Sequence, residues 1–168
     1  MADVAADVLV APSKVEYPFR RTTGPVIGAF FTALREGFIV GIKGSDGTVI
    51  VPPVEYDPQT ADELNEMVEV GDAGEVTTWA WVAEPLEGHP LTTPFAFALI
   101  LLDGAGTPMV HAVDTGGDAS AVSTGMRVKA KWNPARPVDA GDDAEAPVGA
   151  RFREGHILDI ACFVPEGA

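Results

Sequence analysis

The chain has 168 residues, of which 46% are hydrophobic and 21% charged, with 18 Gly, 14 Pro and one Cys. This apolar content is too high for a disordered acidic tail, and the length suits a domain that buries about 70% of its unfolded surface. No apolar stretch approaches the ~20 residues that span a bilayer, and the first residues lack the basic start of a signal peptide. The single cysteine, Cys162, excludes an internal disulfide and a cysteine-built zinc site. We therefore expect an acidic globular protein of the cytoplasm.

The negative charge is concentrated in the middle of the chain. The formal net charge is −14, and residues 44–126 contain acidic side chains but no Lys or Arg. The acids outside this segment balance all eleven bases, so the whole net charge belongs to it. Such a field repels nucleic acid and anionic membranes, and we expect neither as a partner. It favours a partner with a basic docking surface, or it is a solvated acidic face that only confers solubility.

A helix is predicted over residues 24–36. Pro25 suits the first turn, Gly37 suits a C-terminal cap, and the apolar residues between them recur at helical spacing. These apolar residues are Ile27, Phe30, Phe31 and Leu34. Residues 1–23 show no periodicity and are expected to form an irregular arm.

Residues 38–51 predict a short hairpin, because two apolar runs flank the turn signal Asp46-Gly47. Pro52-Pro53 ends the second strand. The acidic stretch 60–67 predicts either a short helical turn or a loop.

From Gly74 onward the pattern is typical of β-structure. Strands are predicted over 75–83, 95–102, 109–114, 126–132 and 156–164, with a long loop rich in Pro, Ala and Asp over 133–149. Five such strands favour a small OB-fold barrel, with a Greek-key sandwich as the main competitor. The strand over 95–102 is apolar on both faces, so either the helix over 24–36 or another protein must cover its outer side.

No catalytic constellation stands out in the sequence. The three histidines, His89, His111 and His156, lie apart from other metal-ligating residues, and His89 and His156 are expected at the surface. His111 is expected to be structural, and Cys162 a core residue. The pair His111 and Asp114 is the most that a free-standing enzyme could use.

Two groups of residues are candidates for binding. Arg127, Lys129 and Lys131 alternate along one strand, so they share a face that either binds phosphates, as in coenzyme A, or pairs with neighbouring acids. Three further bases, Arg136, Arg151 and Arg153, could lie nearby. The aromatic residues Trp79, Trp81, Phe95 and Phe97 lie on neighbouring predicted strands. If these four side chains point inward they form the core, and if they point outward they form one aromatic patch for a partner.

The order of these features resembles the acyl-CoA-associated OB-fold family, from about Gly24 to the C-terminus. The similarity rests on Leu34-Arg35-Glu36-Gly37, Pro52-Pro53, Gly74, the segment from Pro94-Phe95 to Leu102-Asp103, and Gly125-Met126-Arg127-Val128. The resemblance implies a mainly β protein in three parts. These are an arm over 1–23, a helix with a rubredoxin-like zinc ribbon over 24–73, and a five-stranded OB-fold over 74–168.

The predicted ribbon departs from the family at its metal ligands. The four positions that carry thiolates in the family hold Lys43, Asp46, Asp57 and Thr60 in this sequence. A protonated Lys cannot coordinate zinc, and two carboxylates with a hydroxyl make a poor tetrahedral site. We expect a metal-free ribbon-like hairpin, in which Lys43 pairs with Asp46 or Asp57.

The resemblance also implies a function. Family members look like non-catalytic partners of thiolase-superfamily enzymes, including lipid-transfer-protein-like thiolases and aldolases of sterol side-chain or fatty-acyl catabolism. We therefore expect an accessory subunit in a hetero-oligomer, with no cofactor of its own and acyl-CoA as a ligand shared with its partner. A free-standing thioesterase or hydratase is the alternative. A nucleic-acid-binding OB-fold is a weaker one, because the strands that bear the aromatic residues lack Lys and Arg.

Overall fold

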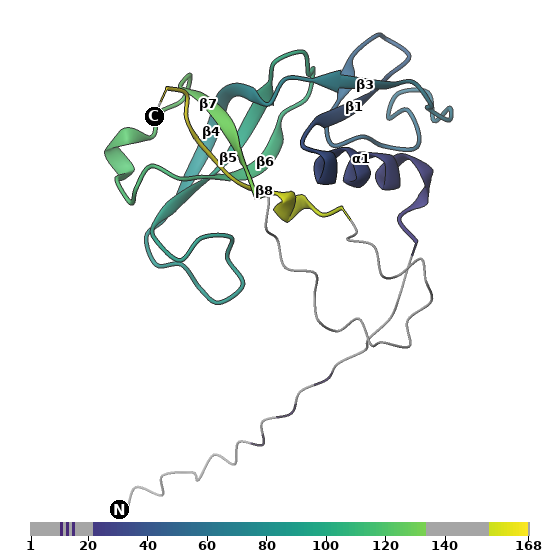
Figure 1. Cartoon of the computed structure of the whole chain (residues 1–168). Coiled ribbons are helices and arrows are strands. Elements are labelled where there is room, and N and C mark those ends of the chain that lie inside the picture. The colour runs from purple at the N-terminus through teal and green to yellow at the C-terminus, as the bar shows by residue number, and fades with distance from the viewer. Residues whose placement is uncertain (1–10, 12, 14, 16–21, 134–154, 168) are drawn as a thin grey trace, which may run out of the picture.

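A computed structural model describes residues 11, 13, 15, 22–133 and 155–167. A helix and a three-stranded sheet lie at one end of the molecule, and a closed five-stranded barrel lies at the other (Figure 1). Nearly all of the arm expected over 1–23, and all but the first residue of the loop expected over 133–149, lie outside the described residues. None of the helices described is long and apolar enough to cross a membrane.

The predicted helix is confirmed as α1 (Gly24–Glu36), with Pro in its first turn. Gly37 ends it in the left-handed conformation, with φ of 90°, and its N–H donates to the carbonyls of Ala33 and Leu34. A side chain would be strained at this φ, which explains the glycine. The buried face of α1 consists of Val26, Phe30, Ala33 and Leu34.

The predicted hairpin is confirmed as β1 (Ile39–Lys43) paired antiparallel with β2 (Val49–Ile50). A third strand, β3 (Met67–Val70), pairs with the other edge of β1 and gives the order β2-β1-β3. This strand was not predicted. The loop expected over 60–67 is correct up to residue 66, apart from an isolated bridge between Glu63 and Tyr56, but Met67 already belongs to β3. A strand of four residues is too short to show a period.

The barrel consists of β4 (Ala73–Val82), β5 (Phe95–Leu102), β6 (Met109–Val113), β7 (Arg127–Trp132) and β8 (Ile160–Pro165). It closes in the order β4-β5-β6-β8-β7, with β6 and β8 parallel and the other pairs antiparallel. The closed barrel confirms the OB-fold over the sandwich. Two 3-10 turns were not predicted, η1 (Ala119–Ala121) and η3 (Ile157–Asp159). The last strand therefore begins at Ile160, not at His156.

One continuous core joins the helix, the sheet and the barrel, and includes Leu34, Ile39 and Ile100. The turn between β5 and β6 ties the parts together. The Thr107 hydroxyl accepts from the Val51 N–H at 2.8 Å and donates to the Val51 carbonyl at 3.1 Å. The Gly106 N–H donates to the Val49 carbonyl at 2.7 Å. This turn therefore forms hydrogen bonds along β2 and the residue that follows it, and holds the three-stranded sheet against the barrel.

Candidate functional site

The two loops at the predicted metal-ligand positions are residues 44–48, between β1 and β2, and residues 51–66, between β2 and β3, and they meet at Asp57. This side chain is 4% exposed and accepts hydrogen bonds from backbone N–H groups of both loops. Ser45 donates at 2.7 Å from the first loop, and Gln59 and Thr60 donate at 2.7 and 3.1 Å from the second. The bond from the Ser45 backbone, followed by that from Gln59, lowers the pKa of Asp57 to about 2. Asp57 is therefore an ionised, buried cross-link between the loops.

The ion pair that we expected between Lys43 and Asp46 or Asp57 is wrong. Lys43 Nζ instead contacts Glu66 Oε1 at 3.0 Å, on the exposed surface. Lys43 ends β1 at the one exposed position of that strand, so its side chain lies at the surface, where it contacts Glu66. The Asp46 carboxylate accepts from the Thr48 N–H and from Gln59 Nε2, both at 2.8 Å.

The four positions do not fit a zinc ion. Lys43 points elsewhere, and the oxygens of Asp46 and Asp57 are occupied by N–H donors. The Thr60 hydroxyl accepts from the Asp62 N–H at 3.3 Å. Across the described part of the chain, no three His, Cys, Asp or Glu side chains gather where they could hold a metal ion.

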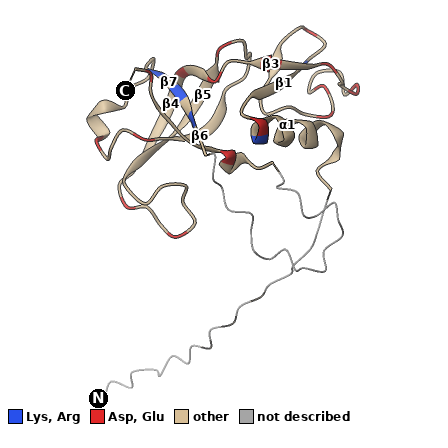
Figure 2. Cartoon of the chain, in the orientation of Figure 1, with Lys and Arg blue, Asp and Glu red and all other residues tan. Residues whose placement is uncertain are grey.

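The basic strip on β7 follows the predicted alternation, with exposed Arg127, Lys129 and Lys131 between buried neighbours (Figure 2). Arg127 holds both Asp103 oxygens, at 2.7 and 2.6 Å, and Glu166 at 2.9 Å. Lys129 lies 3.7 Å from Asp72. Within the described residues Lys131 has no ion-pair partner, unlike Arg127 and Lys129. Arg136, Arg151 and Arg153 lie outside the described residues.

The four aromatic residues do not form one surface. Trp79 and Trp81 pair with Ala98 and Ala96 and pack on the barrel core, so they face inward. Phe95 and Phe97 alternate with these alanines and face outward, in a separate cluster with Cys162. The single aromatic patch considered from the sequence is therefore wrong. Cys162 is 2% exposed as expected, and burial raises the pKa of its thiol.

Among the described residues, the outer side of β5 is covered at one end only. The cover there is the loop between β4 and β5, not the helix or the other protein that we considered from the sequence. His89 packs edge-on against Phe95 and Phe97, with ring centroids 5.7 and 5.9 Å apart, and Leu91 joins the same cluster. Both come from the loop between β4 and β5. Toward the other end, half-buried Leu99 lies opposite Val110, which is 61% exposed. Leu101 is half-buried two positions along the same face. We call Leu99, Leu101 and Val110 the outer strip.

His111 and Asp114, the pair considered for a free-standing enzyme, do not lie together. His111 is 6% exposed and lies edge-on to Phe163 at 5.4 Å, on the inner side of β6. Burial lowers the pKa of its imidazole. Asp114 lies three positions further, on the outer side, and accepts from the Gly116 N–H at 2.9 Å. His156 is exposed, as expected, and caps η3 by accepting from the Leu158 N–H at 3.1 Å.

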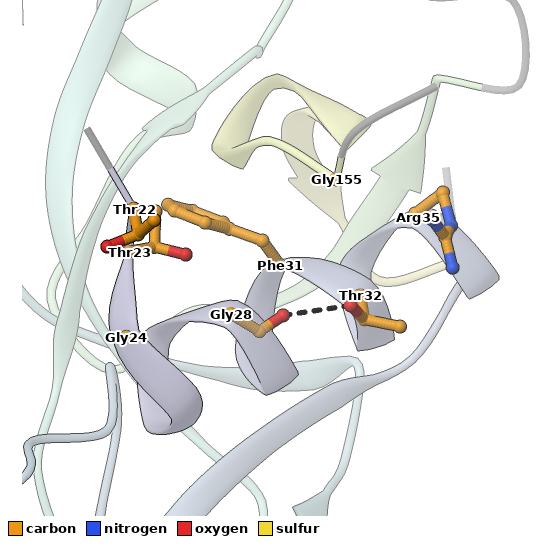
Figure 3. A pocket seen from close by; sticks show the side chains of 8 residues that line it. All are labelled: Thr22, Thr23, Gly24, Gly28, Phe31, Thr32, Arg35 and Gly155. Carbon is orange, nitrogen blue, oxygen red and sulfur yellow. Dashed lines mark hydrogen bonds between the residues drawn. The ribbon is translucent and has the colours of Figure 1, made fainter. Parts of the chain in front are cut away.

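A hollow of about 480 Å³ runs along one side of α1. In Figure 3 the Phe31 ring lies toward Thr22 and Thr23, and Arg35 stands at the other end of the helix. The Thr32 hydroxyl already donates to the Gly28 carbonyl at 2.9 Å, and Arg35 pairs with Glu36 at 3.3 Å. The hollow holds no buried charge and no converging polar groups, so we place no site there.

Comparison with known proteins finds a family model that is similar to part of the barrel. The family model described as the ChsH2 C-terminal OB-fold domain matches residues 67–133, from β3 to the end of β7. A DUF35-family protein of unknown function from Sulfolobus solfataricus is 24% identical, with 64% of this chain and 77% of that chain covered and a TM-score of 0.52. A chain of the Ltp2–ChsH2(DUF35) aldolase is 22% identical, with 70% and 91% covered and a TM-score of 0.55. No curated protein matches this chain.

Proposed function

We propose that this chain, whose barrel is similar to the ChsH2 C-terminal OB-fold domain, is a non-catalytic accessory subunit of a thiolase-superfamily enzyme. The match of residues 67–133 to the ChsH2 OB-fold domain carries the proposal. The solved neighbour in the Ltp2–ChsH2 aldolase supports an enzyme complex as the setting of this barrel. The proposal is also supported by the positions of His111 and Asp114 on opposite sides of β6, where they cannot act as the pair considered for a free-standing enzyme.

The outer strip is the docking surface in this proposal, and a thiolase-fold subunit is its occupant. Leu99, Leu101 and Val110 give an apolar centre on the outer face of the barrel. The segment that contains them carries acids and no Lys or Arg, and exposed Glu75 lies opposite Leu101. An apolar centre within an acidic segment fits a partner patch with an apolar centre and basic side chains beside it.

The ligand of the complex is an acyl-CoA, which in this proposal is shared between the two subunits in sterol side-chain or fatty-acyl catabolism. On this chain, Lys131 supplies the positive charge, since Arg127 and Lys129 already hold carboxylates. One lysine without a carboxylate partner suits contact with a single phosphate at the edge of a partner's site. The barrel interior is filled by side chains, so it has no part in binding the acyl group.

Two valine substitutions test the docking surface. Val110→Asp places a charge in the outer strip, and Val54→Asp makes the same change at a valine in the ribbon loop that is 37% exposed. The tagged variants are purified from the native cells, and the co-purified proteins are identified by mass spectrometry. A thiolase-superfamily subunit with the wild type and Val54→Asp, but not with Val110→Asp, is the expected result. A thiolase-superfamily subunit bound equally by all three chains would refute the outer strip, and its absence from the wild type would refute the function.

A further inference from the structure

We propose that the carboxylate of Asp57 takes the place of a zinc ion as the cross-link between the two loops of the ribbon. A structural metal joins two loops by binding groups from both, and without it such loops are free to separate. Asp57 achieves the same connection with hydrogen bonds. One carboxylate oxygen accepts from Ser45 in the first loop, and the other accepts from Gln59 and Thr60 in the second.

The chemistry of this cross-link suits its position. Bonds from backbone N–H groups to an ionised carboxylate are shorter and stronger than neutral bonds, and the three here measure 2.7, 2.7 and 3.1 Å. The side chain is 4% exposed, so water competes little for its oxygens. All three donors are main-chain groups, which ties the loop backbones themselves and not merely flexible side chains. The carboxylate thus joins the two loops through their backbones.

A second bridge runs parallel to the first. Gln59 Nε2 donates to Asp46 Oδ2 at 2.8 Å, and Asp46 Oδ1 accepts from the Thr48 N–H at 2.8 Å. Gly44 lies close to both acids. A Cβ added at this position would be 3.4 Å from an oxygen of Asp46 and 3.4 Å from an oxygen of Asp57. The residues at two former ligand positions, Asp46 and Asp57, therefore both accept hydrogen bonds that close the loops.

The functional consequence is a ribbon whose fold depends on neither metal supply nor thiol oxidation. This inference does not rest on the accessory-subunit proposal, since it concerns the stability of the isolated chain. It predicts that chelators leave the protein folded. It also predicts that removing the one negative charge of Asp57 loosens both loops together.

The first test is the metal content of the wild-type chain, with its thermal unfolding measured with and without EDTA. The proposal expects no stoichiometric zinc and a midpoint unchanged within about 1 °C. One zinc ion per chain, with a clear loss of stability in EDTA, would overturn it. This measurement decides the proposal even if a variant does not fold.

The second test compares Asp57→Asn with Asp62→Asn, which removes the same charge from an exposed side chain of the same loop. Asp57→Asn is expected to lower the unfolding midpoint by about 5 °C or more. It is also expected to speed hydrogen exchange at the Ser45 and Gln59 amides about tenfold, while the Thr48 amide, bonded to Asp46, changes less. Asp62→Asn should do neither. Equal midpoints and equal exchange in the two variants would overturn the cross-link.

Discussion

At the scale of single residues, Asp57 makes the stability of the protein depend on pH in the acid range. Backbone bonds, first from Ser45 and then from Gln59, hold the pKa of Asp57 at about 2, below its ordinary value of 3.8. Because the folded pKa lies below the unfolded one, this carboxylate stabilises the fold fully above about pH 5 and loses the effect as the pH falls through 3.8 toward 2. In urea unfolding, the difference between wild type and Asp57→Asn should stay constant from about pH 7 to 5 and shrink below about pH 4. A difference independent of pH would contradict this role.

His111 gives a second dependence on pH, closer to neutrality. Burial against Phe163 lowers the pKa of the imidazole below its ordinary value of 6.5. The unfolded chain therefore takes up the proton first, and stability falls as the pH drops below about 6.5. Replacing His111 with Leu should flatten the dependence of the urea midpoint between about pH 7.5 and 5. The same slope in both proteins would show that His111 does not titrate in the folded state as described.

At the scale of the elements, the two ends of the outer face of β5 and β6 should respond differently to truncation. Phe95 is fully buried under the loop between β4 and β5, so Phe95→Ala should cost about 3–5 kcal/mol of the free energy of unfolding. Val110 is 61% exposed, and Val110→Ala should cost within about 0.5 kcal/mol. Urea unfolding measures both. Similar costs would mean that this face is not divided into a covered and an uncovered part.

The elements with strong local signals could be predicted from the sequence. Pro25 and Gly37 mark the two ends of the helix, and Asp46-Gly47 marks the turn of the hairpin. β3 carries no such signal, because it is short and gains its stability from pairing with β1. The reason for a glycine at position 74 also appears only in the folded structure. A Cβ there would meet the backbone of Leu101 and Leu102, so only glycine lets β4 and β5 approach.

The candidate site could be predicted only in part, because the register of strand pairing decides which face of the sheet each side chain occupies. A β-bulge between Val76 and Thr78 shifts the pairing of β4, and the Thr77 hydroxyl donates to the Leu99 carbonyl at 3.1 Å there. One extra residue moves every later side chain to the other face, which turns Trp79 and Trp81 inward. Alternation alone places the bases of β7 on one face, but the carboxylates that hold Arg127 come from distant turns. The cross-link by Asp57 likewise needs the folded loops.

At the scale of the whole molecule, a filled barrel, an acidic middle segment and an exposed outer strip together favour the proposed subunit that acts through a partner. The barrel and the three-stranded sheet share a core and are joined at Thr107, so the chain presents the outer strip on a rigid frame. Charge complementarity then predicts a complex that weakens as salt is raised, because screening reduces attraction between the acidic middle segment and a basic partner surface.

The most direct measurement is acyl-CoA turnover by three purified samples: this chain alone, the thiolase-superfamily subunit that co-purifies with it, and the two together. The account predicts no turnover by this chain alone, and a higher rate for the mixture than for the partner alone. Loss of that increase with Val110→Asp would connect the rate to the outer strip. Turnover by this chain alone, at a rate abolished by His111→Leu, would contradict a non-catalytic accessory subunit.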